Sequence, residues 1–558
     1  MKPIGFVDRV SRFTVGLLAV VGLLASVGSG AVRASAEPAD GPLVSAAWLE
    51  RHRQGGDIVL LDASPAQAYT AGHLPGAISV DFMSYGFPEP PLAELERRYQ
   101  SWGLSPGRKV VIYDLGGSFF ATRLFYALYY HGFPLSDLHV LDGGLAKWRA
   151  LGLPVVQEVT PAPMMGTFRI AALRDDARVM LPEFLEASGD RTRHALIEAN
   201  GPDQHFGEAA FFDRAGHVPN AILMPFEEFY NADKTFKSPD EIRRMLAHFG
   251  VRPDQQVHTH CGGGVAASVP FFAARFLAGY PRVRLFQESQ MGWLADPREL
   301  PFWTYGAPSL LKDGQWVRSW GGRMMRMYGV SRVSIVDVRG ADDYKLGHVP
   351  FALPIPADVF RRHLADPVAL ARVLGAAGVD ATHEAVVVSG AGLTKEAALA
   401  FVSLERAGQA KTSILLGSLE QWVQRGYAVS TEPTVVGPKK APFDTSVVPT
   451  DYPAAVRAGV IIAGATPTQG VYPKVYIASG TTMPTKRPEG TVVHLPYTEL
   501  VGADGTPKPA KDLWKVLSKA GVPRYAELVA FADDPAEAAV TYVALRLMGF
   551  PDAKVQVF

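Results

Sequence analysis

The sequence predicts an α/β fold of several domains, each with a mostly parallel sheet covered by helices on both faces. Short apolar runs of strand length alternate with segments of helical spacing, which is the pattern of such sheets. One turn also recurs three times, at residues 72–77 (GHLPGA), 216–221 (GHVPNA) and 347–352 (GHVPFA). Repetition at about one domain's length indicates tandem copies of one fold.

The composition of the whole chain limits the class of protein. Its 558 residues suit about four domains of roughly 150 residues each. A hydrophobic content of 48% and a charged content of 20% describe ordinary folded protein. The chain has 55 basic and 55 acidic residues and therefore no net charge. This balance does not favour binding to nucleic acid or to an anionic membrane surface, and we expect no nucleic-acid partner.

Residues 1–36 are predicted to be a secretory signal peptide. Three basic residues precede a largely apolar run, residues 13–27, and Ala34-Ser35-Ala36 offers a small-residue cleavage site. An uncleaved anchor is the alternative, although the run is short and interrupted by glycine. No later segment has the length of a membrane span. We therefore expect a periplasmic or secreted protein with no stable membrane insertion after cleavage.

Each copy of the turn lies between two apolar strands. The first strand of each copy ends in an acid, namely Asp62, Glu198 or Asp337. The second strand ends at a loop that a helix follows, and the loops begin at Asp114, Cys261 and Ser389. A further strand and a tryptophan-bearing helix close each copy, with Trp148, Trp293 and Trp422. We expect these tryptophans to pack in cores.

A fourth, eroded copy fits the C-terminus. Residues 460–462 would be its first strand, residues 494–496 the remnant of its turn, and residues 528–533 its second strand, which ends at Asp533. The Gly-His turn and the closing tryptophan helix are missing from this copy. The predicted domains are residues 40–158, 174–306, 315–430 and 445–558.

Cys261 is the only cysteine of the chain, so no internal disulfide can form. It follows a strand-like run, residues 256–260, and precedes three glycines and an apolar helical segment, residues 269–277. The glycines let several amide N–H groups point at one sulfur, and the helix N-terminus adds to that field. Both effects favour the reactive thiolate. A buried, inert cysteine is the alternative, but it needs no glycine loop, and we predict that Cys261 is a nucleophile.

Residues 257–268, with residues 216–221 and 235–239 upstream, resemble the active-site region of the rhodanese family of thiosulfate or mercaptopyruvate sulfurtransferases. The resemblance implies four rhodanese-like domains, of which only the second is active. Asp114, Ser389 and Asp533 stand where the others would need a cysteine. It further implies that Cys261 carries sulfur as a persulfide, and no cofactor or metal is expected.

The resemblance also assigns partners. The substrates would be a small sulfur-donor anion and a thiol or cyanide acceptor, and a protein acceptor is possible. The backbone amides expected to bind the sulfur belong to Gly262, Gly263, Gly264, Val265 and Ala266.

Departures from the family pattern leave the donor open between thiosulfate and mercaptopyruvate. Gly262 and Gly263 replace the basic or serine residues of the two loop types, and the acid-x-arginine after the first strand has become residues 198–200 (EAN). A cation for an anionic donor must then come from elsewhere. Lys237 and Arg214 are the candidates within the second domain. The first domain could contribute through residues 81–98 or around Arg123.

Two other classes of protein could carry a cysteine in such a loop, namely a cysteine phosphatase and a sulfur carrier or binding scaffold. A cysteine phosphatase needs an arginine about six residues after the cysteine to hold phosphate, and Ala267 stands there. A sulfur carrier or binding scaffold without rapid turnover remains the alternative, because three of the four copies have no cysteine.

Overall fold

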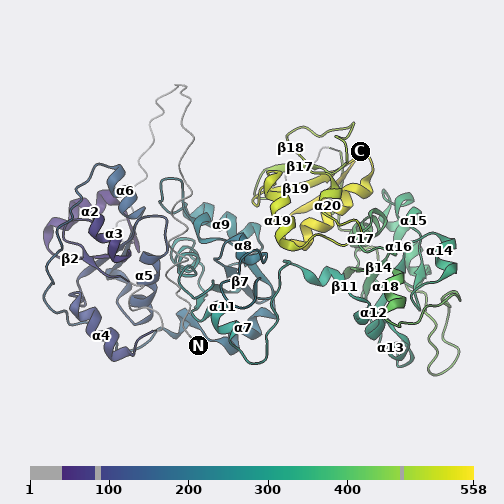
Figure 1. Cartoon of the computed structure of the whole chain (residues 1–558), viewed down its shortest axis with the longest axis horizontal. Coiled ribbons are helices and arrows are strands. Elements are labelled where there is room, and N and C mark those ends of the chain that lie inside the picture. Colours follow the sequence, from purple (N-terminus) through teal and green to yellow (C-terminus); the bar gives the residue numbers. More distant parts are fainter. Residues whose placement is uncertain (1–40, 82–88, 465–469) are drawn as a thin grey trace. The chain divides into compact units, whose positions relative to one another are not determined.

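The computed structural model describes residues 41–81, 89–464 and 470–558 (Figure 1). It confirms the predicted α/β class with four five-stranded sheets. The strand order is the same in all four, and every neighbouring pair is parallel. The predicted signal peptide lies outside the described residues.

The first two sheets use the first ten strands. In the order β1-β5-β4-β2-β3, the first sheet has β1 (Leu43–Val44), β2 (Ile58–Asp62), β3 (Ile78–Ser79), β4 (Lys109–Tyr113) and β5 (Leu138–Leu141). In the order β6-β10-β9-β7-β8, the second has β6 (Arg178–Val179), β7 (His194–Glu198), β8 (Ala221–Leu223), β9 (Gln256–His260) and β10 (Val283–Phe286).

The other two sheets repeat this arrangement. The third has β11 (Leu311–Lys312), β12 (Val333–Asp337), β13 (Leu353–Pro354), β14 (Glu384–Val388) and β15 (Lys411–Leu415). The fourth has β16 (Ile461–Ala463), β17 (Lys474–Ala478), β18 (Thr491–His494), β19 (Glu527–Phe531) and β20 (Ala553–Val557).

Helices connect the parallel strands. In the first domain they are α2 (Ala46–His52), α3 (Ala66–Ala71), α4 (Leu92–Ser101), α5 (Phe120–Tyr130) and α6 (Gly144–Ala150). In the second they are α7 (Leu181–Ser188), α8 (Pro202–His205), α9 (Pro239–His248), α10 (Ser268–Phe272), the π-helix η7 (Ala273–Leu277) and α11 (Ser289–Leu294). The third has α12 (Gly314–Gly321), α13 (Arg323–Met327), α14 (Ala341–Leu346), α15 (Ala357–Arg362), α16 (Pro367–Ala376), α17 (Lys395–Ala407) and α18 (Leu419–Gln424), and the fourth has α19 (Ala510–Lys519) and α20 (Pro535–Leu547).

The sequence pattern did not reveal every strand. The opening strands β1, β6 and β11 have two residues each, too few for a periodicity. In the fourth domain the predicted first strand is β16, which holds the edge position of β1. The strand that corresponds to β2 is β17, which ends in Ala478 rather than in an acid.

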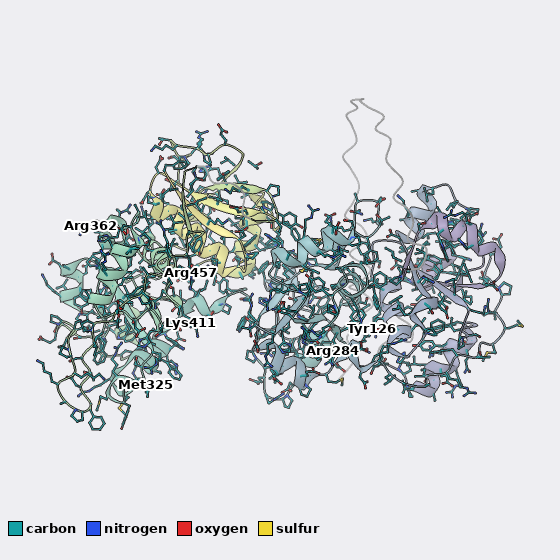
Figure 2. All side chains as sticks on the ribbon, turned by 180° about the vertical axis from the view of Figure 1, so that it is seen from behind. Tyr126, Arg284, Met325, Arg362, Lys411 and Arg457 are labelled. Atoms are coloured by element: carbon teal, nitrogen blue, oxygen red, sulfur yellow. The ribbon has the colours of Figure 1, made fainter. Side chains whose placement is uncertain are left out.

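The first two domains share one hydrophobic core. Helix α5 packs against α10, with the rings of Tyr126 and Phe271 5.0 Å apart and those of Phe125 and Phe272 4.9 Å apart (Figure 2). Helices α17 and α20 form the matching contact between the third and fourth domains. In each pair the packed helices are those that follow the loops at the strand ends, so the Cys261 loop is held close to the first domain.

Buried side chains confirm the expected role of the tryptophans. Trp148 and Trp293 are fully buried, and Trp422 is buried against the third sheet. Among the residues that the structure describes, no helix is long and apolar enough to cross a membrane.

Candidate active site

Cys261 lies at the carboxyl end of β9, which is the middle strand of the second sheet. This is the edge at which active residues of open parallel sheets are found. Residues 261–267 form the loop that leads into α10. The thiol is free, and the side chain is only 3% exposed.

The glycines shape the loop around the sulfur. The Gly264 N–H donates a hydrogen bond to Cys261 Sγ at 3.1 Å. Gly264 has φ +79°, and a Cβ at this position would lie 2.1 Å from the Gln287 carbonyl oxygen. No other residue fits there without moving the backbone. A Cβ on Gly262 would lie 3.0 Å from the ring of Phe211, which therefore covers the outer side of the loop.

The same loop offers further amide donors. In the described part of the chain, the amide N–H groups of Gly262, Gly263, Val265 and Ala266 have no hydrogen-bond acceptor. Together with Gly264 they are the five residues predicted to bind the sulfur. Successive unpaired amides in a turn form a concavity that favours an anion.

Helix α11 anchors the loop from below. Ser289 Oγ accepts a hydrogen bond from Cys261 N at 3.1 Å, and the amides of Gln290 and Met291 donate to the carbonyls of Cys261 and Gly262 at 3.1 and 3.0 Å. Ser289 adopts a left-handed conformation with φ +49°, which is uncommon for a residue with a side chain. This anchoring role had no signal in the sequence, because the hydrogen bond joins residues that are 28 positions apart.

A buried polar cluster lies at the end of the adjacent strand β7. Hydrogen bonds join the Glu198 carboxylate to Asn200, His205 and Gln290. Burial raises the pKa of Glu198, and it lowers the pKa of His217 to about 3 and that of His260 to about 4. The histidines are therefore neutral at neutral pH. Through Gln290 the cluster connects to the backbone of Cys261.

Glu198, His205 and His217 bring potential metal ligands within 4.8 Å of one another. The rings of His205 and His217, however, stack face to face, with centroids 3.6 Å apart and an interplanar angle of 3°. Since a metal ion binds in the plane of an imidazole ring, one ion cannot lie in both planes. Here the residues act as hydrogen-bonding groups, and His217 Nδ1 bonds to the His205 carbonyl at 2.7 Å.

The turn histidines of the other domains have the same structural role. His73 Nδ1 bonds to the Tyr69 carbonyl and His348 Nδ1 to the Tyr344 carbonyl, each at 2.9 Å. Each ring stacks on the tyrosine to which it is bonded. Hydrogen bonds thus hold all three turns, as the repetition of the histidine had indicated.

The comparison with known families agrees with this geometry. The family described as "Rhodanese-like domain" matches residues 45–151, 181–296 and 322–425, more than half of the chain. The chain belongs to this family. The C-terminal copy lies outside these matched residues and repeats the strand order of the other three sheets.

Relatives that match a little under half of the chain are named as sulfurtransferases or as a sulfur carrier protein. A "Probable 3-mercaptopyruvate sulfurtransferase" of Pseudomonas aeruginosa is 32% identical over 249 residues, which is 42% of this chain and 85% of the relative. The "Thiosulfate sulfurtransferase" of Azotobacter vinelandii is 28% identical and covers 46% of this chain and 92% of its own. The "Sulfur carrier protein TtuD" of Thermus thermophilus is also 28% identical, over 45% and 93%. The solved structure of the 3-mercaptopyruvate enzyme SseA of Escherichia coli is 27% identical and covers 45% of this chain and 98% of its own, with a TM-score of 0.41.

In rhodanese-like domain 1 a carboxylate side chain lies in the loop that corresponds to the Cys261 loop. Asp114 occupies the position of Cys261, and its carboxylate accepts hydrogen bonds from the amides of Gly116 at 2.8 Å and Ala121 at 3.0 Å. One loop amide, that of Gly116, and one amide of the first turn of α5 are thus bound to a side chain. Burial raises the pKa of Asp114, and the two hydrogen bonds oppose that shift.

Domains 3 and 4 close the loop in other ways. Ser389 Oγ donates to the Gly392 carbonyl at 2.7 Å, and Leu393 N donates to the carbonyl of Gly505 in domain 4 at 2.8 Å. In domain 4 only residues 532–534 separate β19 from α20, and Asp533 accepts hydrogen bonds from Thr485. The contact with Gly505 has no signal in the sequence, because it joins segments more than a hundred positions apart.

The two predicted cations are not bonded to the loop. Lys237 Nζ forms an ion pair with Glu241 at 2.8 Å. Arg214 donates to the Leu300 carbonyl at 2.9 Å, and its guanidinium lies over the Phe302 ring. Arg214 nevertheless belongs to the segment, residues 207–215, that carries Phe211 over Gly262.

Domain 1 contacts the helix that follows the Cys261 loop, and it also contacts Gln287, which lies beside Gly264 of that loop. Thr122 Oγ1 and Ser268 Oγ are 2.8 Å apart. Glu89, within the segment expected to contribute, accepts hydrogen bonds from Arg178 at 2.9 Å and from Gln287 at 3.2 Å. Burial raises the pKa of Glu89, but hydrogen bonds from His131 and Arg178 outweigh it and lower the pKa to about 2. Residues 82–88 of this segment lie outside the described residues, and Arg123 is buried in α5.

Proposed function

We propose that this protein is a sulfurtransferase that receives a sulfane sulfur on Cys261 and passes it to a thiol or to cyanide. The observation that carries the proposal is a free thiol that accepts a hydrogen bond from Gly264 N–H, in a loop whose other amides have no acceptor among the described residues. Amide donors stabilise negative charge on sulfur without adding a competing nucleophile. The names of the relatives support the same reaction class.

The reaction has two steps. With thiosulfate, the Cys261 thiolate attacks the outer sulfur, a new S–S bond forms, and sulfite leaves with the electron pair of the broken bond. With mercaptopyruvate, the carbon–sulfur bond breaks instead, and the carbon fragment takes a proton to become pyruvate. In the second step the acceptor attacks the outer sulfur of the persulfide, and Cys261 leaves as the thiolate. The amides of Gly262, Gly263, Gly264, Val265 and Ala266 would hold the negative charge in each step.

No second cysteine can resolve the persulfide within the chain. Sulfur must therefore leave to an external acceptor, and the loaded protein should persist when acceptors are withheld. Arg214 is the better of the two candidate cations for an anionic donor, because Glu241 already neutralises Lys237. Both thiosulfate and mercaptopyruvate suit this site.

A sulfur carrier that delivers to a protein acceptor without rapid turnover is the second candidate. Three silent domains and the low exposure of Cys261 favour it, as does the name of the Thermus relative. Export also belongs to the proposal, since residues 1–36 have the order of a cleavable signal. The mass of the mature N-terminal peptide tests it, and a protein that keeps residues 1–36 would contradict cleavage.

The decisive assay is steady-state turnover of each donor with cyanide or a small thiol. The native chain should release product over many cycles, and Cys261→Ser should release none while it keeps the native circular dichroism. Ser389→Ala, at the matching loop position of domain 3, is the control and should retain full activity. Loading of one sulfur without turnover would favour the carrier, and activity in Cys261→Ser would exclude both functions.

A further inference from the structure

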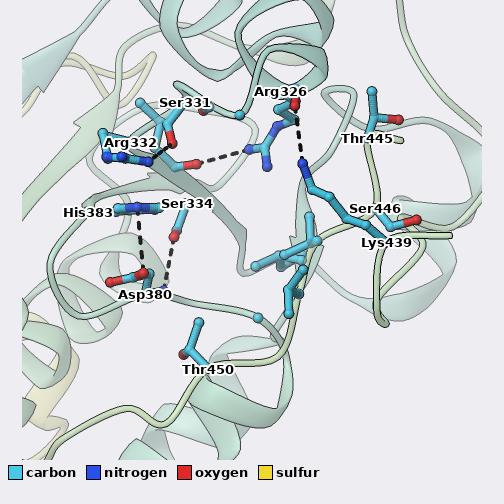
Figure 3. A pocket seen from close by; sticks show the side chains of 16 residues that line it. Arg326, Ser331, Arg332, Ser334, Asp380, His383, Lys439, Thr445, Ser446 and Thr450 are labelled. Carbon is cyan, nitrogen blue, oxygen red and sulfur yellow. Dashed lines mark hydrogen bonds and ion pairs between the residues drawn. The ribbon is translucent and has the colours of Figure 1, made fainter. Parts of the chain in front are cut away.

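Domain 3 has a pocket that is unrelated to the Cys261 loop. It has a volume of about 200 Å³ and lies where the chain enters β12 and β14, at the opposite end of the third sheet from Ser389 (Figure 3). Residues of α13 and the following loop form one side of it. The segment that leads to domain 4, residues 445–450, forms another.

Three permanent cations line this pocket. Among the residues that the structure describes, Arg326, Arg332 and Lys439 form no ion pair within 4 Å, although the charge of Arg332 acts on Asp380 and that of Lys439 on Asp444. Figure 3 shows the side chain of Lys439 next to Arg326, and Lys439 Nζ is 3.5 Å from the Arg326 carbonyl oxygen. Asp380 is the single acid among the sixteen lining residues.

Asp380 does not neutralise the three cations. Its carboxylate accepts a hydrogen bond from Thr382 N at 2.8 Å and lies 3.6 Å from the His383 ring. Burial lowers the pKa of His383, as does the nearby Arg332, so this histidine is neutral at neutral pH. The groups around the pocket therefore carry an excess of positive charge.

The guanidinium of Arg326 is held by two hydrogen bonds to backbone carbonyls. Its Nε donates to the Gly321 carbonyl at 2.8 Å and its Nη2 to the Val333 carbonyl at 3.0 Å, which fixes the plane of the guanidinium. Burial lowers the pKa of Arg326 to about 10, so the group stays charged although its surroundings disfavour the charge. A partly buried cation without a counter-ion is destabilising unless a ligand supplies the negative charge.

We propose that this pocket binds a small tetrahedral dianion of the phosphate, sulfate or thiosulfate class. The fixed guanidinium of Arg326 presents N–H donors in the planar arrangement that suits such oxyanions, and Arg332 and Lys439 supply the remaining charge. The hydroxyl group of Thr445 also lines the pocket and can donate to the anion, whereas the Ser446 hydroxyl already donates to Asp444 at 2.7 Å. The volume leaves room for an ester substituent on the anion. The inference does not depend on Cys261.

Calorimetric titration of the full-length Cys261→Ser protein tests this site, because that variant cannot be loaded with sulfur. Inorganic phosphate, sulfate and thiosulfate are titrated separately at one ionic strength. The test variant is Arg332→Gln with Lys439→Gln, since both side chains are exposed. The control is Arg362→Gln with Arg372→Gln, which removes the same charge from exposed positions of domain 3 that do not line the pocket (Figure 2).

We expect saturable binding of at least one anion in the parent and in the control pair. The test pair should weaken that binding about tenfold or more. The anion that binds most tightly shows whether the ligand is a phosphorus or a sulfur oxyanion. Absence of saturable binding, or an equal affinity in the test and control pairs, would overturn the proposal. The melting curves of the test and control pairs should match that of the parent protein. A variant that keeps both charges, Arg332→Lys with Lys439→Arg, should still bind the anion if the weaker binding of the test pair reflects lost charge rather than altered folding.

Discussion

The loops of domains 1 and 2 occupy the same place in the fold and differ in what fills them. In domain 1 the Asp114 carboxylate accepts hydrogen bonds from one amide of its own loop and from one amide in the first turn of α5. In domain 2 a smaller, softer thiol binds one amide and leaves others unpaired. Within the described residues, the amides of Leu115, Gly117, Ser118 and Phe119 in domain 1 likewise have no acceptor. The two loops therefore differ in the group that the amides meet, which is a carboxylate in domain 1 and a thiol in domain 2.

Domains 3 and 4 extend this comparison. The carbonyl of Gly505 engages the domain 3 loop, and the loop of domain 4 is shortened to residues 532–534. The three domains without a cysteine therefore fill, block or shorten the same loop, while the sheet order stays constant. The fold tolerates all three because the loop lies outside the sheet and its core.

Replacing the thiol by the group of the silent loop should have the largest effect. Cys261→Asp is expected to fold, because the loop amides can bind its carboxylate as they bind Asp114. Sulfur loading should fall below detection, since a carboxylate does not accept sulfane sulfur. Mass spectrometry and circular dichroism of the variant measure both effects, and a variant that does not fold would contradict the equivalence of the two loops.

The glycines allow a matched pair of substitutions. Gly264→Ala should lower turnover about 100-fold, because its Cβ would meet the Gln287 carbonyl and move the amide that binds Sγ. Gly116→Ala in domain 1 would meet the Gly143 carbonyl at 2.3 Å. Each should destabilise its domain by about 1–3 kcal/mol. Turnover in Gly116→Ala should change less than about threefold, and an equal loss in both variants would show that local strain, not the sulfur site, sets the rate.

A further prediction concerns which side chain supplies the positive charge that attracts an anionic sulfur donor. Arg214→Gln should raise the KM for thiosulfate about tenfold and leave kcat nearly unchanged, because it removes attraction for the anion but no reacting group. Lys237→Gln is the control, since the charge of Lys237 is paired with Glu241. Steady-state kinetics at low and high salt measure the effect. A larger loss in Lys237→Gln would reverse the assignment.

The smallest predicted effect concerns the stability of the fold in acid. Strand β9, which precedes the Cys261 loop, contains buried histidines, whereas strand β4, which precedes the Asp114 loop, contains none. Burial lowers the pKa of His258 in β9 to about 3, with help from His194, Arg284 and His260. Because the unfolded state binds this proton more readily, stability falls as the pH drops from about 6.5 toward about 3, by roughly 1.4 kcal/mol per unit.

Removing His258 should reduce this dependence. Hydrogen exchange of the β9 amides at pH 6.5 and 5 should show that His258→Gln loses about 2 kcal/mol less than the native chain over this interval. The amides of β4 serve as the internal control, because β4 is the corresponding strand of domain 1 and has no histidine. Equal pH dependence of β9 in both proteins would exclude His258 as the cause.

Much of the fold could be predicted because the repeated turn and the acid-ended strands are local patterns. The fourth domain was harder, since β17 ends in Ala478 and its turn has no Gly-His pair. Cys261 and its amides could also be predicted, because a single thiol before three glycines is a local signal. The contacts of Ser289, Phe211 and Gly505 could not, since each joins segments that are distant in sequence.

Intact mass of the whole chain after incubation with thiosulfate or mercaptopyruvate, without acceptor, tests the central claim most directly. The account predicts one added sulfur per native chain, stable until a thiol or cyanide is supplied, and none in Cys261→Ser. An unchanged mass with both donors, or the same added sulfur in Cys261→Ser, would contradict the claim that the Cys261 loop of domain 2 is the sulfur site.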